Sequence, residues 1–98
     1  MTHSDQTNSD PEVESYLLLL AAHRSPRTVD AYSRDLAAAG VFLGAPIGTA
    51  STDDLDRWVA EMRANGLAPS TIGRRVAAVR SYYRHQLLLG QRSDNPAA

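Results

Sequence analysis

Arginine supplies every fixed positive charge in this 98-residue chain, and four of the ten arginines lie in one apparent helix. Residues 68–90, APSTIGRRVAAVRSYYRHQLLLG, contain Arg74, Arg75, Arg80 and Arg84 and no acid. Arginine donates paired hydrogen bonds to phosphate and to the guanine edge, which is typical of nucleic-acid binding. Like charges on one helix repel, and an anionic partner relieves that repulsion. The alternative is that acids elsewhere in the chain neutralise these arginines.

The net charge of −1 hides a strong separation of charge along the chain. Residues 1–23 carry four acids and no arginine, residues 24–48 sum to +1, residues 49–68 to −2 and residues 69–98 to +4. Such a dipole favours a basic face at the C-terminal end. The lack of lysine is explained more simply by codon bias in a GC-rich genome, and it costs a phosphate-binding protein nothing.

Other chemistries find little support in the sequence. The histidines, His3, His23 and His85, fall on separate elements, and there is neither a cysteine nor a glycine loop with lysine. The sequence therefore predicts no metal site, no cofactor and no small-molecule ligand. The carboxylates within residues 53–56 suit the first turn of a helix, where they complement its dipole. The N-terminus lacks a signal peptide and residues 17–22 form the longest apolar run, so we expect a cytoplasmic protein without a membrane anchor.

Four helical patterns follow a polar leader, which we predict to be disordered over residues 1–10. The helices are expected at residues 11–23, 26–43, 52–65 and 69–89, each opening at a capping residue or a proline and most of them ending at glycine or at a turn. Apolar residues recur at helical spacing in each, and strand-like alternation is hard to find. Residues 11–98 are therefore predicted to form one all-α domain, a four-helix bundle with short connections.

A helical wheel of the last helix separates two faces. Ile72, Val76, Val79, Tyr83 and Leu87 form the predicted buried stripe. The opposite, exposed face is expected to carry small, basic and hydroxyl residues, namely Ser70, Arg74, Ala78, Ser81 and His85. In the second helix, Arg27 and Arg34 share the side opposite the core with Ala31 and Ala38. Two such faces are suited to straddling a DNA duplex.

Two segments then resemble a known family. SPRTVDAYSRDL (residues 25–36) and GLAPSTIGRRVAAVRSYYRHQLLLGQRSDNPA (residues 66–97) are similar, in this order and separation, to the N-terminal core-binding domain of tyrosine site-specific recombinases, Xer recombinases and phage integrases among them. The resemblance covers about residues 12–98. It implies a SAM-like orthogonal bundle that forms one jaw of a clamp on the recombination-site duplex, with the helices of residues 26–43 and 69–89 against the DNA.

The resemblance also assigns roles to individual residues. Arg74 is the candidate for reading a base edge, and Arg27, Arg34 and Arg75 are assigned to phosphates. Thr28, Ser70 and Thr71 are expected to donate hydroxyl hydrogen bonds to phosphate. Arg80 is expected to pair with Asp35. Ala31 and Gly73 stand where relatives carry longer side chains, so base reading by this domain alone is expected to be weak.

Catalysis is not expected from these residues. The family cuts DNA with a tyrosine of a separate C-terminal domain, so this chain resembles a domain of a longer recombinase. Tyr16, Tyr32 and Tyr83 lie on apolar stripes, and Tyr82 lies near the shoulder of its helix. The expected partners are double-stranded DNA and other recombinase protomers, which assemble as a tetramer on DNA. The alternative is a helical protein–protein interaction module that docks its basic helix on an acidic partner.

Overall fold

The computed structural model of the chain describes residues 10–98, so the predicted leader falls outside it apart from Asp10. The helices are α2 (Pro11–Ala21), α3 (Pro26–Leu43), α4 (Thr52–Ala64) and α5 (Pro69–Leu88), with a short 3₁₀ helix, η1 (Ile47–Thr49), between α3 and α4. No strand occurs among these residues. The predicted all-α fold with four helices is confirmed, with boundaries within two residues of those expected.

Local capping chemistry fixes where three of the helices begin. The Asp10 carboxylate accepts from the backbone N–H of Val13, and the Ser25 hydroxyl accepts from that of Thr28. Ser51 and Asp54 exchange hydrogen bonds in a capping box at the start of α4. These bonds satisfy donors that a helix start leaves without an intrahelical partner.

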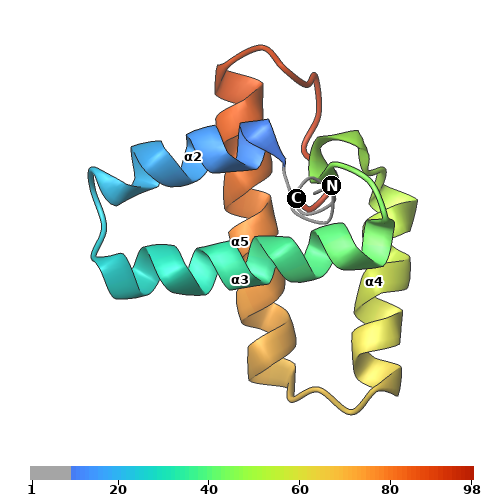
Figure 1. Cartoon of the computed structure of the whole chain (residues 1–98). Helices are drawn as coiled ribbons and strands as arrows, with labels where there is room; N and C mark the ends of the chain where they lie inside the picture. The colour runs from blue at the N-terminus through green and yellow to red at the C-terminus, as the bar shows by residue number, and fades with distance from the viewer. Residues whose placement is uncertain (1–9) are drawn as a thin grey trace, which may run out of the picture.

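The helices form an orthogonal arrangement. Figure 1 shows α2 and α3 running side by side in opposite directions and crossing α5 at a steep angle, while α4 runs beside the first half of α5. α3 and α5 are the central elements, because each packs against all three of the other helices. The N-terminal half of α5 meets α3 and α4, and the C-terminal half passes behind α2.

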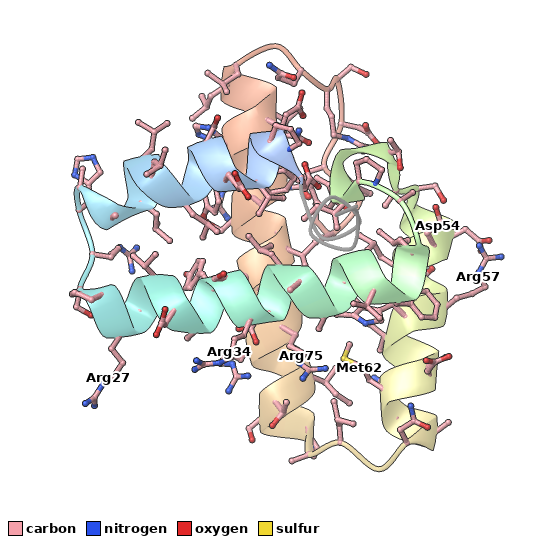
Figure 2. The ribbon with its side chains drawn as sticks, in the orientation of Figure 1. Arg27, Arg34, Asp54, Arg57, Met62 and Arg75 are labelled. Atoms are coloured by element: carbon pink, nitrogen blue, oxygen red, sulfur yellow. The ribbon has the colours of Figure 1, made fainter. Side chains whose placement is uncertain are left out.

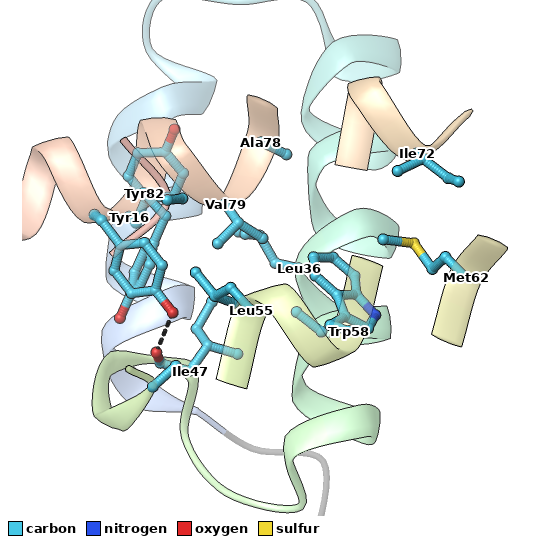
Figure 3. Packing of buried hydrophobic residues seen from close by; sticks show 14 residues of the cluster. Tyr16, Leu36, Ile47, Leu55, Trp58, Met62, Ile72, Ala78, Val79 and Tyr82 are labelled. Carbon is cyan, nitrogen blue, oxygen red and sulfur yellow. Dashed lines mark hydrogen bonds between the residues drawn. The ribbon is translucent and has the colours of Figure 1, made fainter. Parts of the chain in front are cut away.

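The core lies where these helices cross. Figure 3 shows Leu36 of α3, Trp58 of α4 and Val79 of α5 packed together at its centre. Tyr82 and Tyr83 of α5 are fully buried, and the Tyr83 hydroxyl donates to the carbonyl of Ile47 in η1. The placement of Tyr82 near the shoulder of the helix was therefore wrong. Tyr32 is half-buried at the edge of the core rather than inside it.

The residues after α5 fold back onto the bundle. The Nε of Arg80 donates to the carbonyl of Ala97 over 2.9 Å, and the amide of Asn95 donates to the carbonyl of Arg80. Arg92 lies over the ring of Tyr83 and donates to the carbonyl of Gly48. The C-terminal segment is therefore an ordered part of the domain. None of the helices in residues 10–98 has the length and apolar character needed to cross a membrane.

Candidate nucleic-acid interface

One edge of α3 presents two free arginines. Arg27 and Arg34 are both exposed, two helical turns apart, and neither pairs with a carboxylate among residues 10–98. Figure 2 shows both side chains, with that of Arg75, along the same edge of α3, whereas Arg57 lies at the far end of the molecule. Ala31, which lies between the two arginines in the sequence, is half-buried. Ala38 packs partly against the core, so its predicted place on the side opposite the core was wrong. We call Arg27, Arg34 and Arg74 the arginine row.

Thr28 opens α3 beside Arg27. Its hydroxyl oxygen accepts from the Ser25 hydroxyl over 3.1 Å, and its backbone N–H donates to the same Ser25 oxygen. Because the Thr28 oxygen serves as the acceptor in this pair, its own hydroxyl proton stays available for another acceptor. A phosphate oxygen is an acceptor of the right kind.

Arg74 extends the arginine row from α3 onto α5. Its Nε and Nη2 atoms donate to the two oxygens of Asp35, over 3.1 and 2.9 Å. The hydrogen bonds to this carboxylate raise the pKa of Arg74 above its ordinary value. The prediction that Asp35 pairs with Arg80 was wrong, because Arg80 binds the C-terminal segment instead. The sequence indicated that Asp35 needs a cationic partner, but not which turn of α5 reaches it.

Arg75 occupies a more enclosed position than Arg74. Its side chain is 29% exposed and lies between α3 and α4, with Nε 3.9 Å from Asp35 and Nη1 3.9 Å from the sulfur of Met62. The Nε of Arg75 has no hydrogen-bond partner within the described part of the chain. Its guanidinium therefore adds positive charge to the interface from between α3 and α4, in a position more enclosed than that of Arg74.

The first turn of α5 lies at the same end as these arginines. Ser70 is exposed, Thr71 is half-buried, and Ala68 caps the helix without a side-chain hydrogen bond. Gly73 is exposed, with open space where a side chain would stand. The backbone N–H groups of Thr71 and Ile72 already donate to the carbonyl of Ala68. This end of α5 therefore offers mainly the hydroxyl donors of Ser70 and Thr71, on a surface that an extended ligand can approach closely.

The C-terminal half of α5 differs from the prediction. Ala78, expected on the exposed face, is 1% exposed, because α3 crosses α5 near this residue. Ser81 shares a hydrogen bond of 2.8 Å with the Tyr16 hydroxyl of α2, and the His85 ring lies 5.2 Å from the ring of Tyr16. Burial of Tyr16 raises the pKa of its phenol. Only Ser70 and Arg74 of the predicted exposed face are exposed.

The acidic residues at the start of α4 act locally. Asp54 accepts from the backbone N–H of Ser51 and from Arg57, and the Ser51 hydrogen bond lowers the pKa of Asp54. Arg57 also lies 3.4 Å from Asp53. These pairs confirm the interpretation of the cluster as helix-start chemistry. Within residues 10–98, no three histidine or acidic side chains converge into a candidate metal site.

Comparison with known proteins identifies the domain. Residues 13–88 match the family model described as the phage integrase N-terminal SAM-like domain. The chain therefore belongs to this family, as the two sequence segments predicted.

Three curated relatives are full-length tyrosine recombinases. XerC of Pelobacter propionicus is 38% identical over 94 residues, which cover 88% of this chain and 31% of that protein. XerC of Chromohalobacter salexigens is 40% identical over 91 residues, covering 88% and 30%. XerD of Rhizobium meliloti is 34% identical over 89 residues, covering 86% and 29%. The chain thus spans about a third of the length of the relatives it matches. No solved structure matches it significantly.

Proposed function

We propose that this chain is the core-binding domain of a tyrosine recombinase and holds the recombination-site duplex through α3 and α5. Strand cutting belongs, on this proposal, to the part of the relatives that the chain does not span. The observation that carries the proposal is the arginine row. Arg27 and Arg34 lie along one edge of α3, and Arg74 of α5 adjoins them because it binds Asp35, the residue next to Arg34. Membership of the phage integrase N-terminal family supports it independently.

The proposed contacts divide by chemistry. Arg27 and Arg34 bind phosphates, since free guanidinium groups two turns apart can follow a DNA backbone. The hydroxyls of Thr28, Ser70 and Thr71 donate to neighbouring phosphates. Arg75 adds charge from its enclosed position.

Arg74 alone is placed for a base edge. Its paired hydrogen bonds to Asp35 leave the outer edge of the guanidinium for guanine. With a single candidate base reader, phosphate contacts dominate the affinity. Binding by the isolated domain is then strongly salt-dependent and weakly sequence-specific.

Salt titration of duplex binding tests the proposal. In fluorescence anisotropy with a mixed-sequence duplex, the three arginines assigned to phosphates, Arg27, Arg34 and Arg75, give a slope of about −3 for log K against log salt. Arg34→Ala should make the slope shallower by about 1. Arg57→Ala removes the same charge from the far end of the molecule and should leave the slope unchanged.

Two results count against the proposal. One is binding that does not respond to salt. The other is an equal effect of Arg34→Ala and Arg57→Ala, which means that overall charge and not the arginine row attracts DNA. Tight binding to an acidic protein without binding to DNA supports the protein-interaction alternative instead.

A further inference from the structure

A buried carboxylate lies directly beneath the arginine row. The side chain of Asp35 is 2% exposed, although the neighbouring Arg34 on α3 is exposed. A carboxylate in such a place needs partners, because an unpaired buried charge is strongly unfavourable. Arg74 provides two hydrogen bonds, and Arg75 provides a second positive charge 3.9 Å away.

This contact holds one edge of the Arg74 guanidinium against Asp35 and leaves more than half of the side chain exposed. Its side chain is 58% exposed, while Nε and one N–H of Nη2 are engaged by Asp35. A guanidinium carries five N–H groups in one plane, so three donors, two on Nη1 and one on Nη2, remain unused at its terminal edge. The carboxylate thus fixes the plane of a side chain that would otherwise sample many rotamers.

We propose that Asp35 is a positioning residue for DNA, which orients the free edge of Arg74 toward the duplex before binding occurs. The proposal rests on the proposed function and adds an acidic residue to an interface otherwise defined by positive charge. Asp35 touches no DNA. It acts through Arg74, by removing the ordering that binding would otherwise require.

A simple count of charges and the positioning role predict opposite effects on DNA binding when Asp35 is replaced. Replacing an acid beside DNA adds one net positive charge and should tighten binding. Loss of positioning should weaken it. Since the Debye length is only about 8 Å at 0.15 M salt, screening reduces the charge effect but leaves the ordering effect in place. Whether replacement of Asp35 weakens or tightens duplex binding at physiological salt therefore distinguishes loss of positioning from the charge effect.

The chain offers a matched control on the same helix. Asp30 is exposed on α3 between Arg27 and Arg34 and pairs with no arginine among residues 10–98. We expect Asp35→Asn to weaken binding to a mixed-sequence duplex about tenfold at about 0.15 M salt. Asp30→Asn should tighten it about twofold, through charge alone. Circular dichroism confirms beforehand that each variant is folded.

A second variant covers the case in which Asp35→Asn fails to fold. Arg74→Lys keeps the charge and still neutralises Asp35, but an ammonium group cannot form the two-pronged contact. It should lose about as much affinity as Asp35→Asn, and the double variant should lose no more than either single variant. Non-additivity of this kind indicates that Asp35 affects DNA binding through Arg74.

The outcomes separate the two proposals. If the wild-type chain shows no salt-dependent duplex binding, the proposed function fails and the positioning role fails with it. If the wild type binds but Asp35→Asn tightens binding as Asp30→Asn does, the positioning role is overturned and the proposed function stands. Wild-type affinity in Arg74→Lys overturns it as well.

Discussion

The two halves of α5 carry two arginines each and use them in different ways. In the first half, residues 69–77, Arg74 and Arg75 flank the buried Asp35 of α3 and remain at least partly exposed. In the second half, Arg80 binds the C-terminal segment and Arg84 is exposed. The surrounding helices decide this difference, since α2 covers the second half and leaves the first open beside α3.

The comparison shows that charge on a helix is not equivalent to a binding surface. All four arginines contribute equally to the formal charge of residues 69–98. Only those of the first half adjoin the exposed arginines of α3. We therefore expect substitutions of the buried or hydrogen-bonded residues of the second half to change stability, and those of the arginines of the first half to change DNA binding.

The largest expected effect is on the stability of the second half. Tyr82 is fully buried, meets Tyr16 edge-on at 5.5 Å between ring centroids, and accepts a hydrogen bond from Gln86. Tyr82→Ala should lower the free energy of unfolding by about 3–5 kcal/mol, measured by urea denaturation. Ser70→Ala in the exposed first half should change it by less than about 0.5 kcal/mol. If Tyr82→Ala and Ser70→Ala lower the free energy of unfolding by similar amounts, the division between the two halves of α5 is wrong.

The buried tyrosines of this half also predict alkaline unfolding. Burial raises the pKa of Tyr83 to about 12 and raises that of Tyr82 as well. The folded state holds these protons more tightly than the unfolded state. Their contribution is therefore complete below pH 10 and is lost as the pH rises toward 12. For Tyr83 alone the loss is on the order of 2 kcal/mol.

The variant Tyr83→Phe isolates this contribution. It should be about 1 kcal/mol less stable than wild type at neutral pH, because the carbonyl of Ile47 loses its donor. Its stability should then fall less steeply between pH 10 and 12, and because the wild-type loss exceeds the initial difference, the two curves should cross in this range. Melting temperatures measured across this range provide the check, and parallel curves contradict the prediction.

A smaller effect is expected when an acid is placed on the first half. Ala77 is exposed on α5 with arginines three residues away on either side, Arg74 and Arg80. Ala77→Glu should weaken duplex binding about tenfold, which equals about 1.4 kcal/mol, through repulsion of phosphate and neutralisation of the row.

The matched control for this substitution lies on α4. Ala60 is exposed and also has an arginine three residues away on either side, Arg57 and Arg63. Ala60→Glu therefore introduces the same charge in the same local setting, and should change the affinity about twofold or less. If Ala77→Glu and Ala60→Glu lower the affinity for the duplex equally, the DNA binds elsewhere on the molecule.

The ends of the helices could be predicted from the sequence because their causes are local. Asp10, Ser25 and the Ser51–Asp54 capping box each act within three residues along the chain. The exposure of Arg27 and Arg34 was predicted for a related reason. The apolar stripe of α3 is continuous, so its opposite side follows from helical periodicity.

The orientation of α5 and the partner of Asp35 depend on contacts between distant segments. A helical wheel ranks residues by hydrophobicity, and Ser81 and His85 rank low, yet Tyr16 of α2 packs against both of them. Residues 89–98 carry no periodic signal, although Arg92 and Asn95 anchor them. Which arginine reaches Asp35 depends on where α3 crosses α5, and spacing along the chain does not encode that.

The smallest effect concerns the two arginines of the second half. Arg80→Ala removes the hydrogen bond to the carbonyl of Ala97 and should lower the free energy of unfolding by about 1 kcal/mol. Arg84→Ala should change it by less than about 0.5 kcal/mol, because Arg84 is exposed and has no partner among residues 10–98. Urea denaturation measures both, and faster amide exchange in residues 95–98 of Arg80→Ala locates the loss.

The same pair of variants tests the limit of the DNA surface. Each removes one positive charge from the covered half of α5, so neither should alter the slope of log K against log salt. If Arg84→Ala makes that slope shallower by about 1, a phosphate contact lies in the second half. The interface would then extend along the whole of α5, and the division between its halves would hold for stability alone.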